Sequence, residues 1–142
     1  MCQDESVEIC FPIEWIVEGV PISQQAQNKE PWKQAVRAAV KDLLPQNHFL
    51  TEAPLHVTIF YFPDADMEGD LDNIVKPILD ALIGIVYVDD SQIDRLLVQR
   101  FEPGRLQAFE APTASLAEAA VREGPRVYIR LDAPIRQENR RG

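Results

Sequence analysis

The sequence has 142 residues and a mass of 16.1 kDa, which is the size of one domain. Its 46% hydrophobic and 26% charged residues exclude a collagen, a coiled coil and a wholly disordered chain. There is no apolar run long enough to span a membrane, no signal peptide at the acidic start, and too few cysteines for a disulfide framework, so we expect a cytoplasmic protein. The net charge of −9 argues at first sight against nucleic acid as a partner.

The spacing of apolar residues and the positions of Pro and Gly predict seven elements. In chain order they are a strand over residues 7–20, a helix over 30–43, a strand over 55–62, a helix over 72–83, a strand over 93–101, a short helix over 115–122 and a strand over 126–131. Pro77 falls inside the second helix, so we expect this helix to bend there or to start later than Asp72.

These elements predict an α+β fold with a mixed sheet of four or five strands and two main helices packed on it. The single domain is expected to cover residues 1–132, followed by a polar, mobile tail over residues 133–142. Trp15 and Trp32 are expected in the core rather than on a surface that stacks on bases.

The negative charge is concentrated in one segment. Residues 64–94 contain nine acidic residues and a single basic one, Lys76, so this segment carries nearly all of the net charge. Asp70 and Asp72 lie two residues apart where a loop enters the second helix. Lys76 follows Asp72 by one helical turn, and Asp80 follows Lys76 by another, so the three side chains are predicted to share one stripe of the helix.

A second acidic pair, Asp89 and Asp90, follows an apolar segment that can return alongside the same helix. Carboxylates that converge in this way repel one another, by about 4 kcal/mol for a pair 4 Å apart at an effective dielectric constant of 20. Such a cluster is retained chiefly when a cation occupies it. Ligands that are all oxygen favour Mg²⁺ or Mn²⁺ over zinc, and a carboxylate-held Mg²⁺ beside a lysine is suited to phosphoryl transfer.

The same residues resemble the signature of the RusA family of Holliday junction resolvases. The resemblance lies in three motifs that occur in the family's order and near its spacings: Asp70-Leu71-Asp72-Asn73-Ile74-Val75-Lys76, Asp80-Ala81-Leu82 and Asp89-Asp90-Ser91-Gln92-Ile93.

The resemblance implies a small Mg²⁺-dependent endonuclease, able to use Mn²⁺, that acts as a homodimer and resolves four-way DNA junctions by paired symmetric nicks in recombination and repair. It needs neither an organic cofactor nor a membrane. By motif position, Asp70, Asp72 and Asp90 would hold the metal and Lys76 would be the essential lysine. Asp80, Asp89 and Gln92 match motif positions that would support these four.

Two other interpretations remain open. The acidic residues before Asp70 stand where a junction-binding protein would favour Arg, which is compatible with a metal-dependent nuclease of another preference, such as flaps or RNA. The second is a non-catalytic homologue that binds a metal or a partner protein. Bases that could contact phosphates recur every four residues at Lys29, Lys33, Arg37 and Lys41, although such a face is more often simply solvated.

Overall fold

The computed structural model describes residues 8–67, 69–104 and 108–134. In these ranges the elements are β1 (Ile13–Glu18), α1 (Glu30–Lys41), β2 (Leu55–Phe62), the 3₁₀ turn η1 (Leu71–Ile74), α2 (Val75–Leu82), the 3₁₀ turn η2 (Asp90–Gln92), β3 (Ile93–Arg100), α3 (Ala114–Val121) and β4 (Arg126–Asp132). No helix in the described ranges has the length and apolar character needed to cross a membrane.

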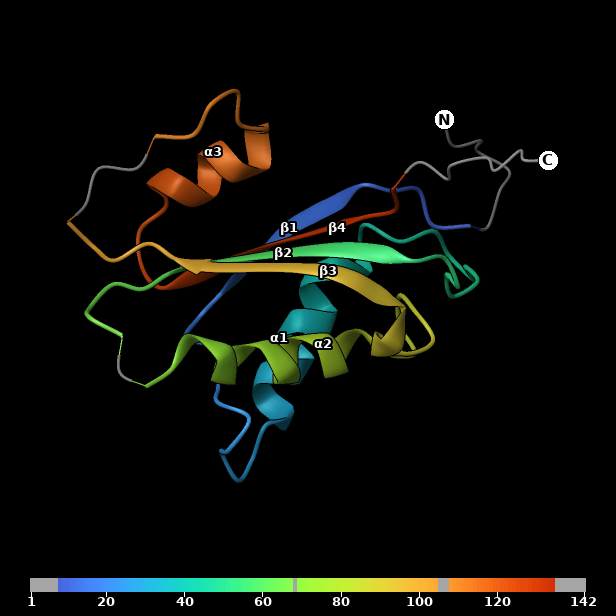
Figure 1. Cartoon of the computed structure of the whole chain (residues 1–142), viewed down its shortest axis with the longest axis horizontal. Helices are drawn as coiled ribbons and strands as arrows, with labels where there is room; N and C mark the ends of the chain where they lie inside the picture. Colours follow the sequence, from blue (N-terminus) through green and yellow to red (C-terminus); the bar gives the residue numbers. More distant parts are fainter. Residues whose placement is uncertain (1–7, 68, 105–107, 135–142) are drawn as a thin grey trace.

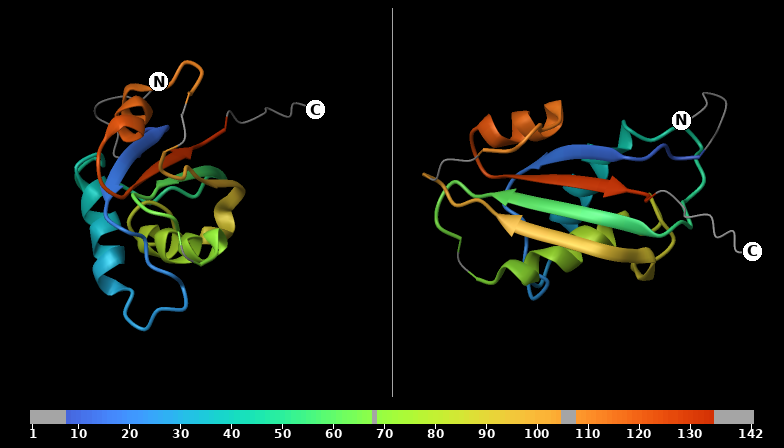
Figure 2. Two further views of the ribbon diagram at one scale, coloured as in Figure 1. Left: turned by 90° about the vertical axis from the view of Figure 1, so that its left-hand side faces the viewer. Right: turned by 45° about the horizontal axis from the view of Figure 1, so that its top comes forward.

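The four strands form one mixed sheet in the order β1-β4-β2-β3 (Figures 1 and 2). β4 pairs antiparallel with both β1 and β2, whereas β2 and β3 are parallel. A parallel pair needs a crossover connection, and α2 provides it between β2 and β3. The predicted α+β class is therefore confirmed, and the acidic motifs lie on this crossover.

Helices α1 and α2 cover one face of the sheet, and α3 lies on the opposite face (Figure 1). The main core fills the space between the sheet and the first two helices. The inward positions of β2 (Leu55, Val57 and Ile59) are completely buried there, as the alternation of apolar residues predicts. Trp15 and Trp32 are buried in the same core, which confirms their predicted position.

Most predicted limits agree with the structure to within two residues, and two elements differ more. The first strand is shorter than residues 7–20, because Pro12 has no N–H to donate to a sheet and Gly19 adopts a φ of +125°. The segment over 72–83 forms η1 first and then α2 from Val75. Pro77 consequently falls in the first turn of α2, where no intrahelical N–H donor is needed. Most of the predicted tail, residues 135–142, lies outside the described residues.

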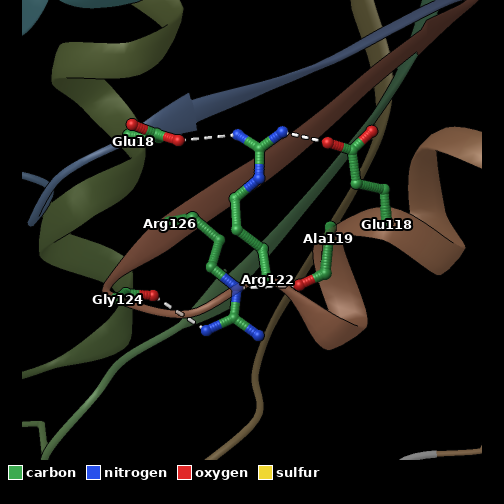
Figure 3. Close-up of polar contacts among 6 residues, drawn as sticks. All are labelled: Glu18, Glu118, Ala119, Arg122, Gly124 and Arg126. Carbon is green, nitrogen blue, oxygen red and sulfur yellow. Dashed lines mark hydrogen bonds and ion pairs between the residues drawn. The ribbon is translucent and has the colours of Figure 1, made fainter.

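A pair of arginines attaches α3 to the sheet (Figure 3). Arg126, buried at the start of β4, donates hydrogen bonds to the carbonyl oxygens of Ala119, Ala120 and Gly124, and its guanidinium lies 4.7 Å from the ring centre of Phe62. Arg122 forms ion pairs with Glu18 and Glu118. The last carbonyls of α3, which a helix end leaves without partners, are thus satisfied by a side chain of β4.

Candidate active site

Asp70 and Asp72 lie where the loop after β2 enters η1. Asp70 is the residue before the first turn, with φ −96° and ψ 141°, and its carbonyl oxygen accepts a hydrogen bond from the N–H of Asn73 (3.1 Å). Its carboxylate makes no capping hydrogen bond. Both Asp70 and Asp72 are exposed. Their carboxylates are therefore directed by the backbone of η1 but remain accessible to a ligand.

Lys76 lies between two carboxylates that come from different parts of the chain. Its Nζ is 2.9 Å from Oδ1 of Asp80, one turn further along α2, and 2.7 Å from Oδ2 of Asp90 in η2. Hydrogen bonds to Asp90 and then to Asp80 raise the pKa of Lys76 above its ordinary value. The lysine is thus held protonated and half-exposed at the surface. The predicted stripe is confirmed for Lys76 and Asp80.

Gln92 holds the segment that carries Asp89 and Asp90. Its Oε1 accepts hydrogen bonds from the N–H groups of Val88 (2.9 Å) and Asp89 (3.0 Å), and its Nε2 donates to the carbonyl oxygens of Thr51 (2.9 Å) and Ala53 (3.0 Å). The amide oxygen thus holds the turn at Val88 and Asp89, and the amide nitrogen joins this segment to Thr51 and Ala53, before β2. Gln92 is thus a positioning residue for its neighbours.

Asp89 and Gln92 form a capping box at the start of η2, in which the side chain of each residue accepts a backbone hydrogen bond. The carboxylate of Asp89 accepts a hydrogen bond from the N–H of Ser91 (3.1 Å). Hydrogen bonding by the Ser91 side chain, and then by its backbone N–H, lowers the pKa of Asp89. Asp89 therefore stabilises η2, whereas Asp90 faces Lys76. The different tasks of the two adjacent acids follow from the turn of the backbone between them.

Tyr87 anchors the segment between α2 and η2 to α2. The side chain is completely buried, and its hydroxyl donates to the carbonyl oxygen of Leu79 in α2 (2.6 Å). Burial, followed by the charges of Asp90, Asp80 and Asp89, raises the pKa of the Tyr87 phenol. The return of the apolar segment alongside α2, which the sequence predicts, is confirmed by this contact.

Beside Asp70 is a cavity of about 310 Å³ that sequence reasoning did not identify. Tyr61 at the end of β2 and Ser23 in the β1–α1 loop both line it. That loop is joined to the motif, since Gln24 donates through its N–H to the carbonyl oxygen of Asn73 (2.8 Å) and through Nε2 to Oδ1 of Asn73 (3.4 Å). In the sequence, the only indication of this contact is that Asn73, next to Asp72, has a polar side chain.

The acidic lining of this cavity supplies oxygen atoms only. Asp64, Asp66 and Asp70 all contribute to it, and together with Asp72 and Asp90 they have the donor chemistry of a Mg²⁺ or Mn²⁺ site. Across the described residues, no group of three or more His, Cys, Asp or Glu side chains is arranged to hold a metal ion. Asp90 is instead paired with the ammonium of Lys76.

The sequence model of the family described as Endodeoxyribonuclease RusA matches residues 21–132. This range contains every predicted site residue and all but the first strand of the sheet. The chain belongs to the RusA family. No curated protein matches the chain at a significant level. Membership in the RusA family indicates an endodeoxyribonuclease, and it confirms the family resemblance of the three acidic motifs.

Proposed function

We propose that this RusA-family protein is a Mg²⁺-dependent endonuclease that resolves four-way DNA junctions by paired symmetric nicks, in recombination and repair in the cytoplasm. The observation that carries the proposal is the contact of Lys76 with Asp80 and Asp90, at the start of a helix that Asp70 and Asp72 precede. This contact joins the family's motifs into one charged surface, and the family match covers all of them.

Asp70, Asp72 and Asp90 are the proposed metal ligands. Carboxylate oxygens are the preferred ligands of Mg²⁺, and Mn²⁺ has similar preferences. The bound metal would supply positive charge to polarise the scissile phosphate and to make a water molecule more acidic. Asp70 and Asp72 are exposed and can receive such an ion without the unfolding of a buried segment.

Lys76 is proposed to stabilise the negative charge that develops on the scissile phosphate. Hydrogen bonds to Asp90 and Asp80 raise its pKa, so it is a cation at neutral pH. A fixed cation of this kind lowers the barrier more than it strengthens substrate binding, because the charge on the phosphate increases in the transition state. Asp80 positions the ammonium from the same helix face, and Asp89 and Gln92 position the segment that carries Asp90.

The proposed active species is a homodimer. A four-way junction offers two equivalent strands related by a two-fold axis, and two copies of one active site related by the same symmetry would cut them in matching positions. The acidic surface around Asp70 repels the phosphates of DNA. Most phosphates of the substrate must therefore be bound by groups outside residues 64–94.

The experiment that tests this function compares substrates. Purified protein is incubated with a labelled four-way junction, a linear duplex, a flapped duplex and a double-stranded RNA of the same sequence, each with and without Mg²⁺. We expect paired nicks in the junction alone, and only with Mg²⁺. Preferential cleavage of the flap or the RNA would assign a different nuclease, and Mg²⁺ binding with no cleavage of any substrate would assign a non-catalytic homologue.

A further inference from the structure

A second cavity lies at the C-terminal end of α1, where this helix meets the segment after α2. Its volume is about 560 Å³, which is within the range of sites for small ligands. Its walls come from α1, from residues 44–50 and from Gly84 and Ile85. Arg37 and Lys41 lie on its helical wall, and its remaining polar side chains are neutral amides and His48.

This cavity differs in charge from its neighbours on the described surface. The cavity beside Asp70 is lined by three aspartates, and a third hollow is lined by Glu8 and Glu52. A fourth has three acids against one base: Asp64, Glu102, Glu123 and Arg126. In contrast, no carboxylate lines the cavity at the end of α1. In a chain with a net charge of −9, this is a local positive site.

The cations of this site are held by different means. Arg37 donates through Nε to the carbonyl oxygen of Ala81 (3.0 Å), which fixes the guanidinium against the end of α2, and only one of its terminal nitrogens approaches Glu30 (3.5 Å). Lys41 is exposed, and among the described residues it has no ion-pair partner. Arg37 is therefore preorganised, and Lys41 is available for an incoming anion.

The opposite wall is also fixed before any ligand binds. Nδ1 of His48 lies 3.0 Å from the carbonyl oxygen of Pro45, and Nε2 lies 2.6 Å from that of Ile85. His48 thus connects the α1–β2 segment to the segment after α2. The apolar side chains of Leu44 and Leu50 also line the cavity. A lining that combines basic and apolar side chains suits a phosphate together with the carbon atoms of its sugar.

We infer that this cavity binds a backbone phosphate of the DNA substrate through Arg37 and Lys41, on a surface separate from the cluster around Lys76. The inference rests on the proposed function, which supplies the DNA. It gives the acidic protein a defined place for substrate phosphates outside residues 64–94. It also divides the four basic residues along this side of α1 into two classes, since Arg37 and Lys41 line the cavity whereas Lys29 and Lys33 do not.

The test compares Lys41→Gln with Lys29→Gln, which remove the same charge from the last residue of α1 and from the residue just before its start. Junction binding is measured by fluorescence anisotropy in Ca²⁺ from 50 to 200 mM salt, conditions chosen to follow binding without cleavage. Loss of one phosphate contact reduces the slope of log K against log[salt] by about 1. We expect this reduction, with several-fold weaker binding at 100 mM salt, for Lys41→Gln, and a slope within error of wild type for Lys29→Gln.

A neutral methylphosphonate placed at successive positions of one junction arm identifies the phosphate. We expect one position at which the substitution weakens binding by wild type but causes a clearly smaller loss with Lys41→Gln, in which only Arg37 remains to contact that phosphate. Equal slopes and affinities for the two variants, or additive losses at every methylphosphonate position, would overturn the cavity as a phosphate site. Absence of junction binding by wild type at every salt concentration would overturn the proposed function instead.

Discussion

The Nζ of Lys76 lies 2.7 Å from a carboxylate oxygen of Asp90, fourteen residues further along the chain. This contact connects the helix that crosses between the two parallel strands, β2 and β3, with the turn that starts the second of them. Lys76 and Asp90 belong to the first and third of the family motifs, and Asp80, the second partner of Lys76, belongs to the second motif. All three motifs therefore meet at one ammonium group. The chemistry that we propose depends on this meeting point.

Replacement of Lys76 by Met is expected to reduce junction cleavage at least about 100-fold, the usual effect of the loss of one charge-stabilising group. Because Lys76 and its partners are partly exposed, the free energy of unfolding should change by less than about 1 kcal/mol. Single-turnover cleavage and urea denaturation measure the two effects. Lys33→Met, which removes an ion-paired lysine from α1, is the matched control and should cleave normally. Normal cleavage by Lys76→Met would show that Lys76 does not take part in the reaction.

Replacement of Gln92 by Ala is expected to lower the free energy of unfolding by about 2–4 kcal/mol, because four hydrogen bonds worth about 1 kcal/mol each are lost. Cleavage should also fall, since Asp90 is no longer held beside Lys76. Gln99→Ala on the exposed part of β3 controls for the loss of an amide and should leave both quantities unchanged. If Gln92→Ala is destabilised but cleaves at the wild-type rate, the amide stabilises the fold without positioning Asp90.

Replacement of Arg126 by Met is expected to lower the free energy of unfolding by about 2–3 kcal/mol, because the last carbonyl groups of α3 lose a buried donor. Arg122→Gln removes a neighbouring arginine whose ion pairs are more exposed, and it should cost less than about 1 kcal/mol (Figure 3). Chemical denaturation of both variants checks the difference. Equal losses would mean that α3 is held by the ion pairs rather than by Arg126.

The three tyrosines predict an unusual response to alkaline pH. Burial raises the pKa of Tyr61 and of Tyr87, and it raises the pKa of Tyr128 to about 12. A raised pKa in the folded state leaves stability unchanged below the ordinary value near 10 and reduces it as the pH rises further. Absorbance at 295 nm should therefore show less tyrosine ionisation at pH 10 in the folded protein than in the urea-unfolded protein, while circular dichroism of the former remains native. A full tyrosine step at pH 10 in folded protein would contradict the buried positions.

Local patterns in the sequence were sufficient for much of the fold. Alternation predicted β2 and β4, and the spacing of four residues predicted that Lys76 and Asp80 share one stripe of the helix, because both patterns depend on neighbours within one element. The contacts of Gln92 with Thr51 and Ala53 could not be predicted, since about forty residues separate the partners and only the folded chain brings them together.

The basic face of α1 shows the same limit. Regular spacing predicted that Lys29, Lys33, Arg37 and Lys41 share one side of the helix, but it could not show that Glu30 pairs with two of them. Nor could it show that Arg37 and Lys41 line a cavity with Gly84 and Ile85, which come from beyond α2.

The central claim is that the carboxylates before α2 and the cluster of Lys76 form one metal-dependent active site for junction cleavage. The most direct measurement is the single-turnover rate of paired nicking of a saturating four-way junction in Mg²⁺ by wild type and by Asp72→Asn, with junction binding measured in parallel. We predict junction-specific, Mg²⁺-dependent nicking by wild type, and a variant that binds the junction but nicks it at least about 100-fold more slowly. Equal nicking rates for the two proteins would contradict the account.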